Sequence, residues 1–366
     1  MAEPVIFVFQ GGGALGAFEC GVYRELVPYL QARGHRIAAL AGASIGAINA
    51  AYLSVRQQEA DWGAQALETF WREQLSTPAL PFLPPLSPYL ARWNGLLTNL
   101  LSGNPQMFCP NWPGWLPASE SVRFFQPLYR TEPMANLLDQ HIGPIGPVPT
   151  EQPLLLVRTV DVERQATRSF INWRDTITPN HLRASASLPM LFPPVEIDGT
   201  YYWDGAFWPQ TALREVLNAL QQERPPGTAP ESYWLIVVDT SDTLSQQIPV
   251  SALKSSYRLL GIMFGNRADY DEAAIAMGNR YIELVNDLTE TAMAQPDQPW
   301  ARRILAEAAR IERENRCPIR CTRIRRTSLP HEHISRDLDY SPDRIDQLIA
   351  QGAEAARAIL REVQHH

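Results

Sequence analysis

The sequence predicts an α/β fold of the α/β/α kind, with a mainly parallel central sheet flanked by helices, because it opens with two strand-to-helix units. In the first unit, the apolar run at residues 4–10 leads into three consecutive glycines and then a helix with an apolar stripe. That helix is expected to end at Pro28. In the second unit, the apolar run at residues 37–41 leads into a glycine-flanked turn and the helical segment 47–54. Ligands of such folds bind at the carboxyl ends of the strands, where both turns are expected.

The remaining residues are expected to belong to the same single domain, residues 1–366. Two further apolar runs, LLLVRTV at 154–160 and WLIVV at 234–238, are expected to complete the sheet. Residues 77–117 are crowded with Pro, Trp, Phe and Leu without a regular period, which predicts an irregular cap or lid insertion. Apolar and charged residues at helical spacing predict a helical C-terminal extension over residues 296–363.

The composition is that of a compact globular protein, with 45% hydrophobic and 19% charged residues. The formal net charge of -7 excludes a general basic field, so no nucleic-acid partner is expected. No secretory signal is readable at the start, which predicts a cytoplasmic location; any peripheral attraction to a membrane is expected to be local and largely apolar. The oligomeric state is left open. Four cysteines are too few and too scattered for a disulfide framework.

Ser44 is the candidate nucleophile. It stands in the pattern Gly42-Ala43-Ser44-Ile45-Gly46, between a predicted strand and a predicted helix. This is the setting of a nucleophile elbow, in which flanking glycines allow a sharp turn and raise the hydroxyl clear of the sheet. On this motif alone, an ordinary serine N-cap is an equal alternative.

The first glycine loop is the candidate oxyanion hole. It begins with Gly11, Gly12 and Gly13 and ends with Gly16, where it opens a helix. Backbone N–H groups at a helix start are free to bind negative charge, and such donors stabilise the tetrahedral intermediate of ester hydrolysis. The loop also fits the G-x-G-x-x-G pattern of a dinucleotide-binding unit. That alternative requires an acidic residue about 20 positions further on, whereas residues 30–46 contain none.

Asp204 is the candidate base, because a serine hydroxyl needs a group that accepts its proton. It ends the aromatic run YYWD and is followed by Gly205 and Ala206, which leave room for Ser44. Burial among aromatic groups is expected to raise the pKa of this carboxyl and strengthen it as a base. Taken alone, Asp-Gly is more often an ordinary turn. A surface or core role is expected for all seven histidines: His35, His141, His181, His331, His333, His365 and His366.

The three motifs GGGALG, GASIG and DGA, in this order, resemble the patatin-like phospholipase family. The segment ASASLP at residues 184–189 resembles the family's approach to its catalytic acid, and residues 161–170 resemble the strand pair before it. The likeness covers residues 4–55 and 150–240 well.

The resemblance implies a lipase-like or phospholipase-like serine acyl hydrolase with a Ser-Asp dyad. Ser44 would be the nucleophile, Asp204 the base, and the loop Gly11 to Gly13 the oxyanion hole, with lipid or other acyl esters as substrates and no cofactor. Many members have Arg where this chain has Leu15, which favours a neutral ester over a phosphate-bearing one. The alternatives are a catalytically silent lipid-binding protein on the same fold and, less favoured, a dinucleotide-dependent oxidoreductase.

Two weaker signals remain. The segment 77–117 is interpreted either as a lid for fatty chains or as an extra core layer. Cys317 and Cys321, followed by His331 and His333, do not have the usual spacing of a zinc site, so no metal is expected.

Overall fold

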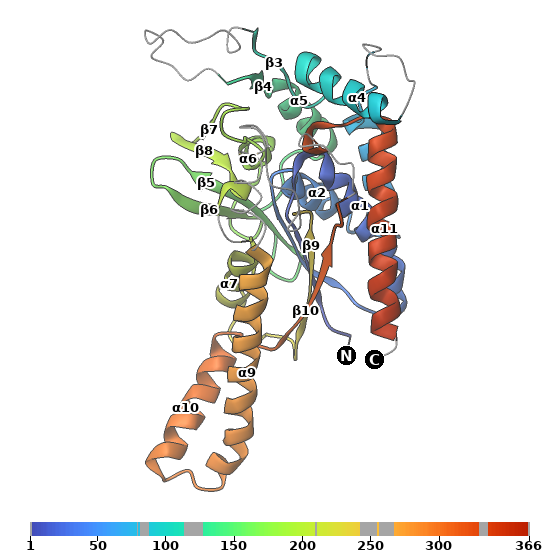
Figure 1. The fold of residues 1–366 in the computed structure, drawn as a ribbon. Coiled ribbons are helices and arrows are strands. Elements are labelled where there is room, and N and C mark those ends of the chain that lie inside the picture. Colours follow the sequence, from blue (N-terminus) through green and yellow to red (C-terminus); the bar gives the residue numbers. More distant parts are fainter. Residues whose placement is uncertain are drawn as a thin grey trace.

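The computed structural model of the chain describes residues 2–78, 80, 88–112, 127–208, 211–241, 255, 267–328 and 336–364. Its described strands form a central sheet in the order β10-β9-β1-β2-β5-β8-β7, with β6 paired to β5 (Figure 1). The five strands from β10 to β5 are parallel, and β6, β7 and β8 join antiparallel. The strands are β1 (Val5–Phe9), β2 (Ile37–Ala43), β5 (Leu154–Asp161), β6 (Ala166–Ile171), β7 (Val195–Ile197), β8 (Thr200–Asp204), β9 (Tyr233–Asp239) and β10 (Ile319–Arg325).

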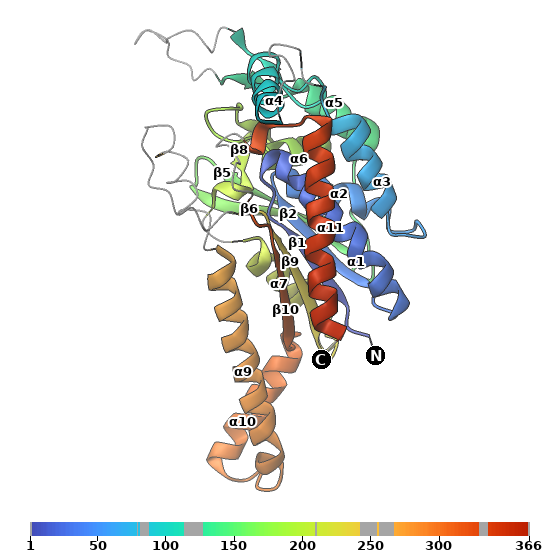
Figure 2. The same cartoon turned by 45° about the vertical axis from the view of Figure 1, so that its right-hand side comes forward.

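Helices cover both faces of this sheet (Figure 2). One face packs against α1 (Gly16–Ala32), α2 (Ile45–Ser54) and α11 (Pro342–Gln364), and the other against α7 (Leu213–Gln222) and the start of α9 (Arg267–Met293). Alternate residues of β1 serve the two cores, since Phe7 lies in the first cluster and Ile6 in the second. The predicted α/β/α arrangement is therefore confirmed.

The other described elements lie around this body. They are α3 (Ala64–Thr69), a π-helical turn (Phe70–Leu75), α4 (Pro88–Ser102), α5 (Glu132–His141), α6 (Pro179–Ser185), α10 (Pro299–Arg313) and the short strand pair β3 (Cys109–Pro110) and β4 (Tyr129–Arg130). None of the described helices has both the length and the apolar character that crossing a membrane requires.

The helix after the glycine loop does not end at Pro28, as the sequence predicted. α1 continues to Ala32 with Pro28 inside it. A proline costs a helix one hydrogen bond and introduces a clash. Here Val27 and Leu30, on either side of Pro28, are fully buried, and this packing keeps the helix intact across the proline.

The predicted cap is more regular than expected. Residues 88–102 form helix α4, which begins at Pro88, and proline is well tolerated in a first helical turn. Met107 and Phe108 are buried in the main core, so this part of the segment is a core layer. Residues 79, 81–87 and 113–117 of the segment lie outside the described residues.

The segment 296–363 contains the expected helices, α10 and α11, but it is not helical throughout. Residues 319–325 form β10, the edge strand of the central sheet. Arg323 and Arg325 of this strand pair with Asp239 at the end of β9. The pairing of residues 319–325 with β9, which is distant in sequence, therefore makes this segment a strand.

Two glycines allow α1 and α11 to pack closely. A Cβ on Gly21 would lie 2.0 Å from the carbonyl oxygen of Ile349, and one on Gly352 would lie 2.1 Å from that of Phe18. We expect Gly21→Ala or Gly352→Ala to lower the free energy of unfolding by about 1–3 kcal/mol, because the helices must separate. Urea unfolding measures the change.

Gly278→Ala in α9 is the matched control, since a Cβ there meets no described atom within 4 Å. It should leave stability unchanged or raise it by up to about 1 kcal/mol, because alanine favours helix over glycine. Equal losses in all three variants would contradict the close packing of α1 and α11.

Candidate active site

Ser44 occupies a strained turn between β2 and α2. Its backbone angles are φ 57° and ψ -137°, a region that residues with side chains rarely adopt. Every residue from 37 to 53 is buried except Ser44. The turn therefore brings this one side chain to the surface out of an otherwise buried strand and helix, as the elbow geometry predicts.

The glycines around Ser44 allow three backbone segments to cross. A Cβ on Gly42 would lie 2.4 Å from the carbonyl carbon of Gly46, and one on Gly46 would lie 2.5 Å from the carbonyl oxygen of Phe9. A Cβ on Gly11 would lie 3.0 Å from that of Ser44. The glycine loop thus touches the serine turn directly, at distances that no other residue type permits.

The three leading glycines of the loop differ in their exposure. Gly11, Gly12 and Gly13 all have left-handed φ values, of 80°, 118° and 58°. Gly11 is buried, and its N–H donates to Glu19 Oε1 at 2.7 Å. Gly12 and Gly13 are partly exposed, and their N–H groups have no hydrogen-bond partner among the described residues. The N–H of Gly11 is therefore already used within the protein. The N–H groups of Gly12 and Gly13 remain the candidate donors of an oxyanion hole.

Asp204 ends β8 and is 2% exposed, which agrees with the expected burial. Its Oδ1 accepts a hydrogen bond from the N–H of Ala206 at 2.7 Å. A Cβ on Gly205 would lie 2.2 Å from the carbonyl oxygen of Arg158. Gly205 is thus required for the chain to turn beside β5, immediately after the acid.

Ser44 and Asp204 are both tied to the short segment Ser185 to Ser187, which we call the serine strap. The N–H of Ser44 donates to the carbonyl oxygen of Ser185 at 3.0 Å and to its Oγ at 3.1 Å. The N–H of Asp204 donates to the carbonyl oxygen of Ser187 at 3.0 Å. Ser185 Oγ in turn donates to the carbonyl oxygen of Arg158 at 2.6 Å. The sequence predicts this segment only by its likeness to the family and gives no sign that it tethers the two residues.

The strand register agrees with this link. Ala43 of β2 pairs with Arg158 of β5, and Thr159 of β5 pairs with Asp204 of β8. β6 pairs with one edge of β5 over residues 156–161, so β2 and β8 follow each other along the other edge. The end of β2 before Ser44 and the end of β8 at Asp204 therefore lie beside adjacent residues of β5. Two residues far apart in sequence are brought to one place by the sheet.

A buried polar network supports the glycine loop from below. Glu19 accepts from Gly11 through Oε1 and from Asn49 Nδ2 through Oε2 at 2.8 Å. Asn49 Oδ1 accepts from the indole N–H of Trp71 at 2.9 Å. Burial raises the pKa of Glu19 to about 8, although the hydrogen bonds from Gly11 and Asn49 lower it in part. The sequence does carry a signal for this network, since Glu19 is an acid among the apolar residues of α1.

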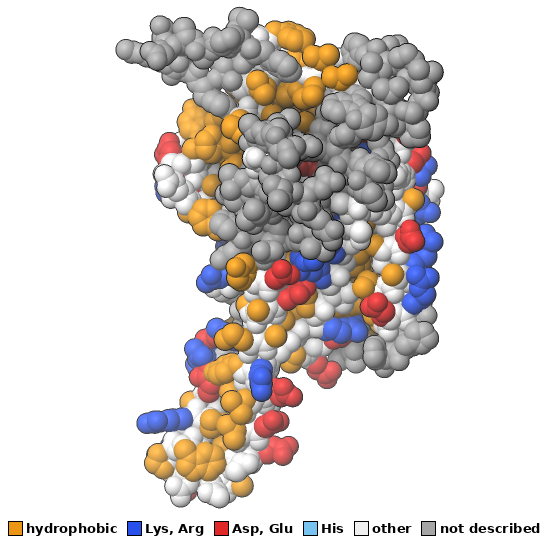
Figure 3. Space-filling view, in the orientation of Figure 1, with side chains coloured by type: hydrophobic (Ala, Val, Ile, Leu, Met, Phe, Trp, Pro, Cys, Tyr) orange, Lys and Arg blue, Asp and Glu red, His pale blue; other side chains and the backbone are white. Residues whose placement is uncertain are grey.

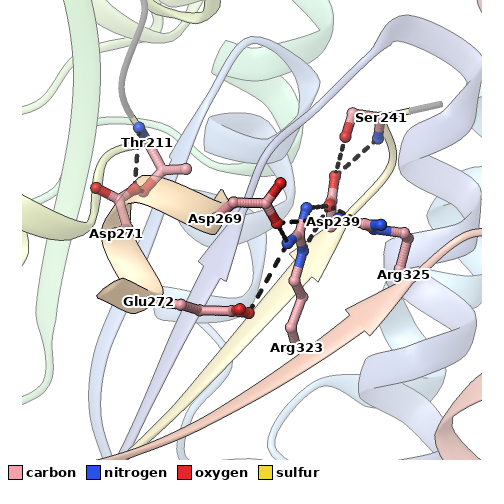
Figure 4. Close-up of polar contacts among 8 residues, drawn as sticks. All are labelled: Thr211, Asp239, Ser241, Asp269, Asp271, Glu272, Arg323 and Arg325. Atoms are coloured by element: carbon pink, nitrogen blue, oxygen red, sulfur yellow. Dashed lines mark hydrogen bonds and ion pairs between the residues drawn. The ribbon is translucent and has the colours of Figure 1, made fainter. Parts of the chain in front are cut away.

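A second charged cluster holds the end of β9 beside the loop (Figure 4). Asp239 is fully buried, ion-pairs with Arg323 and accepts from the N–H of Ser241 at 2.9 Å. Arg323 also pairs with Asp269 of α9. Between Asp239 and Ser241, the hydroxyl of Thr240 donates to the carbonyl oxygen of Gly11. The cluster therefore fixes the strand end that holds the first glycine.

The described histidines have structural contacts. His181 forms a capping box with Thr178 at the start of α6, and His35 Nδ1 lies 2.7 Å from the carbonyl oxygen of Glu3. The ring of His141 lies against that of Phe70. The other four histidines lie outside the described residues.

Cys317 and Cys321 are partly buried against the core beneath α7 and α9. Burial raises the pKa of each thiol to about 12, which disfavours the thiolate that a metal would bind. Among the described residues, no group of three or more His, Cys, Asp or Glu side chains is arranged to hold a metal ion.

Residues 7–216 match the patatin-like phospholipase family, a span that includes the glycine loop, the serine turn and the acid. The chain belongs to this family, and family membership makes it a lipid acyl hydrolase in general terms. Among solved structures, VipD from Legionella pneumophila is similar at 12% sequence identity and a TM-score of 0.33, covering 95% of this chain and 67% of the VipD chain. No curated protein matches the sequence.

The raised pKa of Glu19 predicts a pH-dependent stability. Because this pKa is about 8 in the folded protein against 4.5 for the free group, the folded state holds an extra proton between these pH values. The free energy of unfolding should therefore fall as pH rises through this window, by up to about 1.4 kcal/mol per pH unit.

Urea unfolding from pH 5 to 8.5 measures this slope, which Glu19→Gln should flatten because the variant has no proton to lose. Glu59→Gln, at an exposed acid on the surface, is the matched control and should keep the wild-type slope. Identical slopes in wild type and Glu19→Gln would refute the assignment.

Proposed function

We propose that the chain is a carboxylic-ester hydrolase that uses Ser44 as nucleophile, Asp204 as base, and the N–H groups of Gly12 and Gly13 as the oxyanion hole. The observation that carries the proposal is the serine turn. One strained, partly exposed serine lies against a glycine loop and shares the serine strap with a buried acid. Strained backbone conformations of this kind are concentrated at functional sites.

In the proposed cycle, Ser44 Oγ attacks the ester carbonyl carbon while Asp204 takes the hydroxyl proton. The negative charge that develops on the carbonyl oxygen is held by the N–H groups of Gly12 and Gly13. Collapse of this intermediate breaks the ester bond, and the leaving alcohol takes the proton from Asp204. Water then attacks the acyl-serine, Asp204 accepts its proton, and that proton returns to Ser44 as the fatty acid leaves.

The surroundings of Asp204 support its role as the base. A buried carboxylate is less well solvated than one in water, and it accepts a proton more readily. The buried guanidinium of Arg158 acts in the opposite direction, because its charge is close enough to interact with that of Asp204. Asp204 is therefore a buried acid with a cation nearby.

We propose a neutral acyl ester as the preferred substrate. Leu15 stands where many family members have Arg, and it is buried in the core beside α1. The glycine loop thus lacks the fixed cation at this position that would attract a phosphate group. An uncharged headgroup fits such a loop better.

Ser44→Ala and Asp204→Asn should each lower kcat/KM for p-nitrophenyl butyrate by at least about a thousandfold, because each removes a group that acts in every turnover. A fluorophosphonate probe should label wild type and fail to label Ser44→Ala. Ser54→Ala, at the far end of the same helix, is the matched control and should behave as wild type.

Undiminished hydrolysis in either dyad variant would reject the mechanism. Lipid binding by a wild-type protein that neither turns over ester nor reacts with the probe would instead favour the silent lipid-binding alternative.

We also propose that the cap surface receives the fatty chain. Leu101 and Trp112 of the cap are exposed, at 41% and 60%, and Figure 3 shows hydrophobic side chains gathered at the end of the molecule that carries α4. Exposed apolar side chains that cluster mark binding surfaces. Point variants test this better than deletion, because Met107 and Phe108 of the same segment are core residues.

Leu101→Ala combined with Trp112→Ala should raise KM for p-nitrophenyl palmitate by about fivefold or more and leave KM for the butyrate nearly unchanged, since only the long chain reaches the cap. Met293→Ala, an exposed apolar residue far from α4, serves as control. An equal effect on both esters would contradict the role of the cap.

A further inference from the structure

Helices α9 and α10 form a hairpin that projects from the body of the molecule (Figure 1). A small core of Ile282 and Val285 from α9 and Ile311 from α10 holds the two helices together. At 27 residues, α9 is about 40 Å long. The hairpin lies outside the matched family region, so the hydrolase function does not account for it.

A second apolar stripe runs along α9 and is exposed. Its members are Met277, Tyr281, Leu284 and Leu288. Met277 is 76% exposed and Leu284 is 56% exposed, and the other two are exposed to a smaller degree. Hydrophobic side chains are visible along the hairpin in Figure 3. Contiguous exposed apolar side chains on a projecting element mark an interaction surface.

The spacing of this stripe is that of a coiled-coil seam. Met277, Tyr281, Leu284 and Leu288 are separated by four, three and four residues, which places them on one narrow face of the helix. The core that joins α9 to α10 lies on another face, because Ile282 and Val285 lie roughly 100° around the helix axis from the stripe. Of the stripe, Tyr281 also reaches α10, where its hydroxyl donates a hydrogen bond to Glu307. The apolar side chains of the stripe are exposed and outside the core shared with α10, and we call the stripe the open seam.

The charges beside the stripe are self-complementary. Arg280 and Asp287 lie on the same flank, one on each side of the midpoint between Tyr281 and Leu284. Both are exposed, and neither forms an ion pair with the part of the chain that the structure describes. A two-fold axis through that midpoint places Arg280 of each copy beside Asp287 of the other.

We propose that the open seam of α9 binds a second copy of this chain in an antiparallel arrangement. Tyr281 then faces Leu284 of the second copy, and Met277 faces Leu288 of the second copy. Two symmetric Arg280–Asp287 pairs flank the contact. The two hairpins together form a four-helix bundle with one isologous interface.

The charge of α9 disfavours a membrane as the occupant. The helix carries six acidic residues and two arginines, so an anionic lipid surface would repel it. Membrane-lying helices have a basic polar face, which this one lacks. A protein partner with matching charges is favoured, and a second copy supplies them.

Sedimentation equilibrium of the full-length chain, at concentrations from nanomolar to micromolar, tests the proposal. Wild type should be dimeric and Leu284→Glu monomeric, since a charge at the centre of the seam cannot be buried unpaired. Arg280→Asp or Asp287→Arg alone should raise the dimer Kd by about tenfold, because each places like charges together twice.

The decisive variant carries Arg280→Asp and Asp287→Arg together, which should restore the wild-type Kd because the pairs reform with opposite polarity. Glu290→Arg, on another face of α9, is the matched control and should not change the Kd. Circular dichroism and thermal unfolding verify that each variant is folded.

A wild type that is monomeric throughout would overturn the proposal, as would a dimer unaffected by Leu284→Glu. Failure of the double variant to recover would overturn the antiparallel arrangement. A monomeric wild type that binds 3:1 phosphatidylcholine:phosphatidylglycerol vesicles, with binding lost in Leu284→Glu, would assign the seam to membranes instead. None of these outcomes depends on ester hydrolysis, so the two proposals stand or fall separately.

Discussion

The whole site depends on the direct contact between the backbones of the glycine loop and the serine turn. A Cβ on Gly46 would lie 2.5 Å from the carbonyl oxygen of Phe9, and one on Gly11 would lie 2.5 Å from that of Ala43. Side chains at these positions would force β1 and β2 apart at their carboxyl ends. Because the two loops are in direct contact, neighbouring backbone holds the strained conformation of Ser44, whose side chain is partly exposed.

Buried charge supports this contact from two directions. Glu19 holds the N–H of Gly11 from the side of α1, and Thr240 holds its carbonyl from the end of β9, where Asp239 and Arg323 fix the strand. The first glycine is thus hydrogen-bonded through both its polar groups, while Gly12 and Gly13 remain accessible. The proposed oxyanion hole would benefit from a loop that is fixed in advance, since reorganisation during the reaction would lower the rate. The two networks supply that rigidity.

The molecule consists of a body that matches the family and of segments that lie beyond the matched region. The sheet, the glycine loop, the serine turn and the acid all fall within the family region, residues 7–216. β10 and α11 lie beyond it, yet they complete the sheet edge and cover α1. The α9–α10 hairpin contributes only the start of α9 to the main core, and its outer part has a small core of its own. Its exposed seam is consistent with a role in assembly that is separate from the chemistry.

The sequence by itself determined the α/β class and the glycine and serine motifs, because these depend on local patterns: an apolar strand, a glycine-permitted turn and a helical period. Only the tertiary structure decided that α1 runs through Pro28, that residues 319–325 form a strand, and that Glu19 occupies the N–H of Gly11. It also placed Ser44 and Asp204 beside adjacent residues on one edge of β5, with both tied to the serine strap. These features result from tertiary packing and buried hydrogen bonds, whose free energy outweighs local propensity.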